Sequence, residues 1–112
     1  MYSQALDLAS HMNGLAYEEF LCRLALVSVL GSRGDFAAAN EHITRAQELI
    51  ADKSDRLAFR FREVLLMLWQ GRYTQAHAAE ELQGLIHAFG EMGLLQEQAA
   101  VKLHLADLYR VM

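Results

Sequence analysis

The side chains of this 112-residue chain best suited to metal binding or proton transfer are five histidines: His11, His42, His77, His87 and His104. His77 precedes Glu80 and Glu81 by three and four residues, a spacing that places an imidazole and a carboxylate on one face of a helix. A closed metal site needs about four converging donors, and spacing ties no other donor to this pair. We therefore expect structural histidines, and we predict neither a metal site nor a cofactor.

Cys22 is the one thiol that could act as a nucleophile. A catalytic thiol requires a nearby base and an accessible, electropositive setting, whereas Cys22 falls in the most apolar segment of the chain, where cysteine is usually a small core residue. The sequence has no phosphate-binding G-x-x-x-x-G-K loop, and its spacings support no serine–histidine–acid arrangement. We therefore expect a protein that is not an enzyme.

A basic stripe is the third candidate site. Lys53, Arg56 and Arg60 follow one another at spacings of three and four, so they share one face of a helix. Such a stripe could clamp an acidic peptide or a C-terminal carboxylate through charge-assisted hydrogen bonds, and we take Arg56 and Arg60 as partner-binding candidates. The alternative is a solvated face on which nearby carboxylates balance these charges, namely Asp52, Asp55 and Glu63.

The elements that must position these residues are helices. The chain contains no proline, and apolar residues recur at spacings of three and four, as in Leu57, Phe61 and Val64. Asp35 and either Ser54 or Asp55 have the side chains of helix N-caps. We predict an all-α fold with six helical segments: 3–13, 16–32, 36–52, 55–70, 73–91 and 94–112.

The sequence also repeats itself. The stretch 34–39 (GDFAAA) returns as 71–76 (GRYTQA) after 37 positions, and 14–30 resembles 93–109 at an offset of 79. Periods of about 40 residues are typical of helical solenoids, in which each hairpin covers the apolar side of the one before it. Both ends of the chain fall within a repeat, so we expect one domain, 1–112, that is a fragment of a longer array. The alternative is a small, complete helical bundle.

The first repeat resembles a tetratricopeptide (TPR) repeat, with its leucine, its glycine–polar–aromatic turn and its two small packing residues: Leu26, Gly34-Asp35-Phe36, Ala39 and Ala46. The second copy keeps Gly71, Tyr73 and Ala76. In all three copies a basic residue stands where the family has its tryptophan: Arg23, Arg60 and Lys102. Long, proline-free repeats of this kind are similar to those of MalT-like, LuxR-type bacterial regulators. The resemblance implies an antiparallel helix-hairpin solenoid.

The resemblance also implies where a partner would bind, because the first helix of each TPR hairpin lines the concave face. Phe61 and Leu65 are our preferred groove residues, and burial in the core is the alternative for both. The full set that the resemblance directs toward the groove is Leu21, Leu24, Ser28, Ala58, Phe61, Leu65, Ala100, Leu103 and Asp107.

Composition limits the classes of function. The net charge is −4, from 14 acidic and 10 basic residues, which disfavours a nucleic-acid-binding surface. The chain has neither an apolar run of about 20 residues nor a signal peptide, and its single cysteine fits a reducing cytoplasm. We expect a cytoplasmic, noncatalytic protein–protein interaction or scaffold module of a bacterial signalling or transcription regulator, binding a protein or peptide and neither nucleic acid nor membrane.

Two alternatives differ in mechanism from this expectation. The first is a helical domain that senses a small-molecule effector bound between its helices. The second is a complete homodimeric helical chaperone or adaptor. A homodimer could also form through the exposed ends of a solenoid, because uncovered apolar ends tend to pair.

Overall fold

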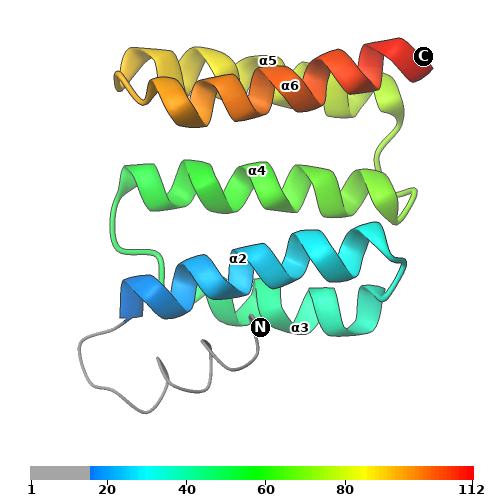
Figure 1. The fold of residues 1–112 in the computed structure, drawn as a ribbon. Helices are drawn as coiled ribbons and strands as arrows, with labels where there is room; N and C mark the ends of the chain where they lie inside the picture. Colours follow the sequence, from blue (N-terminus) through cyan, green and yellow to red (C-terminus); the bar gives the residue numbers. More distant parts are fainter. Residues whose placement is uncertain (1–15) are drawn as a thin grey trace.

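The computed structural model describes residues 16–112, and this part of the chain folds into five α-helices (Figure 1). Sequential helices run antiparallel, and there is no strand within 16–112. The predicted all-α fold is therefore confirmed, while the expected helix 3–13 lies outside the described residues. None of the described helices is long and apolar enough to cross a membrane. The helices are α2 (Ala16–Ser32), α3 (Phe36–Gln47), α4 (Lys53–Trp69), α5 (Gln75–Glu91) and α6 (Leu95–Val111).

Helix α4 lies between two helix hairpins, α2–α3 on one side and α5–α6 on the other, and α2, α4 and α6 run in the same direction (Figure 1). Two apolar clusters fill the spaces on either side of α4. The N-terminal cluster contains Phe20, Leu24, Val27, Ala39, Ile43, Ala46, Phe59 and Leu66. The C-terminal cluster contains Phe61, Val64, Leu65, Ala78, Ala79, Leu82, Leu85, Phe89, Val101, Leu105 and Leu108.

The small residues of the repeat pattern differ in burial. Ala39 and Ala46 have no exposed surface and lie in the N-terminal cluster, so α3 packs closely through side chains that occupy little space. Ala76, which corresponds to Ala39, is exposed on α5. In α5 the buried small residues are instead Ala78 and Ala79.

Three turns share one backbone geometry, because each has a glycine with positive φ: Gly34 at 85°, Gly71 at 76° and Gly93 at 71°. The next residue's amide then bonds to the carbonyl five residues earlier, Asp35 to Leu30 at 2.9 Å and Arg72 to Met67 at 2.9 Å. This is the Schellman arrangement, which favours glycine because a Cβ is strained at positive φ. The recurring glycines thus end helices, as the sequence predicts.

The start of α4 corrects two predictions. Its N-cap is Asp52, not Ser54 or Asp55, and the Asp52 carboxylate accepts a hydrogen bond from the Asp55 amide at 2.9 Å. Hydrogen bonds from the Asp55 amide and the Ser54 hydroxyl lower the pKa of Asp52. The helix expected over 36–52 ends at Gln47, and Asp52 lies beyond it with an extended backbone, φ −141°. Asp35 does precede α3, but its side chain makes no capping hydrogen bond.

Candidate binding surface

The four partner-binding residues predicted from the sequence lie at three separate hollows. Arg56 and Arg60 line one of about 620 Å³ between α3 and α4. Phe61 lines a hollow between α2, α4 and the start of α6, and Leu65 lines another between α4, α5 and α6. Phe61 and Leu65 are also core residues, with 6% and 3% of their surface exposed. The four therefore do not form one continuous site.

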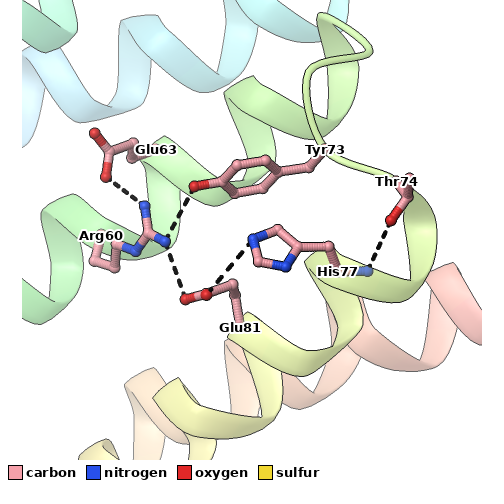
Figure 2. Close-up of polar contacts among 6 residues, drawn as sticks. All are labelled: Arg60, Glu63, Tyr73, Thr74, His77 and Glu81. Atoms are coloured by element: carbon pink, nitrogen blue, oxygen red, sulfur yellow. Dashed lines mark hydrogen bonds and ion pairs between the residues drawn. The ribbon is translucent and has the colours of Figure 1, made fainter.

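Arg60 is held by residues of both α4 and α5 (Figure 2). Its guanidinium donates to the Glu63 carboxylate at 2.6 Å on the same helix. It also donates to the Glu81 carboxylate of α5 at 3.0 Å and to the Tyr73 hydroxyl at 3.2 Å. Tyr73 belongs to the connection between the two helices. The Arg60 side chain therefore joins α4 both to α5 and to the turn between them.

These contacts decide what Arg60 does. Burial on its own would lower the pKa of the guanidinium, but the hydrogen bonds to Tyr73, Glu63 and Glu81 outweigh it and raise that pKa. Arg60 therefore stays charged, and two carboxylates already compensate its charge. A carboxylate arriving from a partner would have to displace one of them, so the geometry favours a structural tie between helices over a peptide clamp. Arg56, by contrast, is exposed.

His77 extends the same cluster. Its Nε2 lies 3.7 Å from a Glu81 carboxylate oxygen, so the two residues do share a helix face. Its ring meets the ring of Tyr73 edge to face, with centroids 4.4 Å apart, and its amide donates to the Thr74 hydroxyl (Figure 2). Within residues 16–112, no group of three or more His, Cys, Asp or Glu side chains could hold a metal ion. The His77–Glu81 pair therefore adds a ring contact and a polar contact to the Arg60 tie.

The hollow that Phe61 lines, here called the α2–α4 groove, has the features of a binding surface. It encloses about 330 Å³. Its lining includes exposed apolar side chains: Tyr17 is 56% and Leu21 43% exposed. The rest of the lining is Phe20, Leu24, Ala25, Ser54, Asp55, Ala58, Phe61, Arg62, Phe89, Leu94 and Glu97. Leu21, Leu24, Ala58 and Phe61 are among the residues that the TPR resemblance directs toward a groove.

Charged side chains of both signs surround this apolar lining. Asp55 is buried, and its carboxylate accepts a hydrogen bond from the Ala51 amide at 3.1 Å, which fixes it at the start of α4. The Arg62 guanidinium lies 5.3 Å from the centroid of the Phe61 ring and donates to the Ser28 hydroxyl. Glu97 is exposed. The lining of the groove thus combines apolar side chains with charged side chains of both signs.

The sequence analysis missed Tyr17 and Arg62 as groove residues. Tyr17 stands in the first turn of α2, and its role depends on where α4 lies, which no local spacing predicts. Arg62 was outside the stripe at 53, 56 and 60 because it occupies a different face of α4. Its position next to Phe61 in the sequence could have indicated that Arg62 lies at the groove, because the TPR resemblance directs Phe61 there.

The surroundings of His104 are structural, whereas Cys22 belongs to neither apolar cluster. The His104 ring packs edge to face on Phe61, with centroids 5.3 Å apart. Burial, then the charge of Arg62, lowers the pKa of His104, while Asp107 opposes this. Cys22 is a free, half-buried thiol on α2.

A comparison of the chain with protein-family models, curated proteins and solved structures finds no match. A proposal of function therefore rests on the arrangement of the helices and on the lining of the α2–α4 groove.

Proposed function

We propose that this chain is a noncatalytic, TPR-like interaction module of a cytoplasmic bacterial regulator, and that it binds a segment of another protein in the α2–α4 groove. The single observation that supports this function is the groove itself, a hollow with a buried aromatic and aliphatic floor beside the exposed side chains of Tyr17 and Leu21. Exposed apolar side chains that adjoin a concave apolar surface are typical of protein-binding sites.

The lining of the groove favours a peptide segment with one or two apolar anchors. Burying a leucine-sized anchor contributes about 1.5–3 kcal/mol, and the exposed side chains of Tyr17 and Leu21 offer most of the contact area. Arg62 and Glu97 lie at the edge with opposite charges, so they favour one orientation of a charged segment over the other. Support for the TPR-like arrangement comes from α2 and α4, which run in the same direction and end in the same glycine turn at Gly34 and Gly71.

The test is a selection of displayed peptides against the intact chain, followed by affinity measurements on two groove variants. Leu21→Glu places a charge on an exposed apolar residue, and Ala58→Arg fills the groove. Both should weaken selected peptides by at least about tenfold, because each removes apolar contact with the anchor. Thr44→Glu is the matched control, since Thr44 is an exposed residue of α3 that does not line the groove. Peptides that bind all four proteins equally would exclude the groove.

The volume of the groove keeps the effector-sensing alternative as a second candidate function. About 330 Å³ lies within the range of small-ligand pockets, roughly 300–1,000 Å³. A metabolite screen by thermal shift, run on the wild-type chain and on Ala58→Arg, separates the two candidates. If a compound stabilises the wild-type chain but not Ala58→Arg, and no peptide is selected, the ligand of the groove is a small molecule and not a peptide.

A further inference from the structure

Helix α6 carries an apolar stripe that the rest of the described chain leaves exposed. Leu95 is 68% and Leu103 67% exposed, and Ala99 and Ala106 are exposed beside them. These four residues follow one another at spacings of four, four and three, so they share one face of the helix. We call this face the α6 stripe. The buried side of the same helix, with Val101, Leu105 and Leu108, packs in the C-terminal cluster.

The same positions are buried in α2. The sequence offset of 79 between the two helices pairs Phe20 with Ala99, Leu24 with Leu103, and Val27 with Ala106. The three α2 residues are 1%, 4% and 0% exposed, and all lie in the N-terminal cluster with residues of α3. In α2 this face is therefore covered by α3 together with Phe59 and Leu66 of α4.

Helix α4 shows the same relation one repeat later. The offset of 37 from α2 leads to Leu57, Phe61 and Val64. Phe61 and Val64 belong to the C-terminal cluster, Leu57 packs against it, and the cluster includes residues of α5. Residues of α3 and α4 thus cover this face of α2, and residues of α5 and α6, including His104 beside Phe61, cover it in α4, whereas in α6 the corresponding face is exposed.

A cation accompanies this face in all three helices: Arg23 in α2, Arg60 in α4 and Lys102 in α6. In the first two helices it bonds to an acceptor of the covering helix. Arg23 donates to His42 of α3 at 3.1 Å, and Arg60 donates to Glu81 of α5 at 3.0 Å. Lys102 is exposed, and no residue within 16–112 forms an ion pair or hydrogen bond with its ammonium group.

We propose that the α6 stripe docks an amphipathic helix of a partner protein, antiparallel to α6, with a carboxylate of that helix paired to Lys102. The antiparallel direction follows from α3 and α5, each of which runs against the helix it covers. Ala99 and Ala106 leave room for larger apolar side chains on the incoming helix. The carboxylate follows from charge complementarity, as Glu81 shows at Arg60.

Charge also distinguishes this partner from a second copy of the chain. An α6 helix packed antiparallel against its own copy about Leu103 would bring two Lys102 ammonium groups side by side, and like charges at such a contact are unfavourable. The α6 stripe is separate from the α2–α4 groove, because Leu103, Ala106 and Lys102 do not line that groove. The proposal therefore goes beyond the proposed function and does not depend on it.

The experiment offers the intact chain a set of helices in trans. Helical peptides based on residues 74–93 keep Glu81 and vary the apolar positions, because α5 is the helix that covers the corresponding face of α4. Peptides selected by display are then measured by fluorescence polarisation on the wild-type chain, Leu103→Glu, Lys102→Glu and the groove variant Leu21→Glu. Both α6 substitutions fall on exposed residues, so the variants should fold, and circular dichroism checks this.

We expect the selected peptides to bind the wild-type chain and Leu21→Glu equally, and to lose binding to Leu103→Glu. Lys102→Glu should weaken binding by at least about tenfold, and a peptide with Glu81→Lys should restore binding to that variant. Selected peptides that bind Leu103→Glu as well as they bind the wild-type chain would overturn the proposal. A wild-type dimer by light scattering that dissociates in Leu103→Glu would also overturn it, by making a second copy the occupant.

Discussion

Helices α2 and α4 have a cation at corresponding positions, and each cation reaches the helix that follows, α3 or α5, yet the two contacts differ. Arg23 pairs with Glu19 of its own helix at 2.9 Å and reaches a neutral acceptor, His42 Nδ1, on α3. Arg60 pairs with Glu63 of its own helix and reaches a carboxylate, Glu81, on α5. The position of the cation is thus the same in α2 and α4, while the helix that follows determines whether the cation meets a neutral ring or a carboxylate.

The comparison extends to a third helix, because Leu24, Phe61 and Leu103 occupy corresponding positions with 4%, 6% and 67% exposure. Phe61→Ala should lower the free energy of unfolding by about 3–5 kcal/mol and Leu24→Ala by about 2–5 kcal/mol, since both leave cavities in the core. Leu103→Ala should change it by less than about 0.5 kcal/mol. Urea denaturation measures all three. A large loss for Leu103→Ala would mean that the α6 stripe is covered within the chain.

A close approach between α2 and α4 gives the next largest expected change in stability. A Cβ built at Gly31 of α2 would lie 2.8 Å from the Trp69 ring and 3.2 Å from Leu66 of α4. Gly31→Ala should therefore cost about 1–3 kcal/mol through overpacking, although alanine favours a helix. Thermal or urea denaturation checks the sign, and a stabilised variant would show that Trp69 moves away easily.

Gly84 is the matched control within a helix. It lies in α5 with no heavy atom within 4 Å of a built Cβ and with no positive φ. Gly84→Ala should therefore raise stability by about 0.5–1 kcal/mol through helix propensity alone. The two glycine variants should thus shift the unfolding midpoint in opposite directions, and shifts of the same sign would contradict the packing assigned to Gly31.

The smallest expected effect is a pH dependence. Burial and then Arg23 lower the pKa of His42 below its usual 6.5. The unfolded chain therefore binds this proton more readily, so stability declines as pH falls through about 6.5 and on through the folded-state pKa. His42→Gln should flatten the melting temperature between pH 7 and pH 5 relative to the wild-type chain, whereas Thr44→Gln, at an exposed residue of the same helix that does not titrate, should leave that slope unchanged. Equal slopes for the wild-type chain and His42→Gln would remove His42 as the cause.

Local patterns in the sequence predict the helices well and the site only in part. The glycines at 34 and 71 and the apolar spacings place α2, α4, α5 and α6 within about two residues of their observed bounds. The end of α3 was missed because Asp52 caps the next helix, a hydrogen bond that the apolar period does not reveal. The basic stripe was interpreted from one helix alone, whereas Tyr73 and Glu81, which hold Arg60, come from 13 and 21 residues further along the chain.

Helix α4 contributes to both apolar clusters, through Phe59 and Leu66 on one side and Phe61, Val64 and Leu65 on the other. Loosening the packing of either hairpin, α2–α3 or α5–α6, would therefore disturb α4, against which the other hairpin also packs. The described part of the chain should consequently melt in one transition, because both apolar clusters include residues of the same helix.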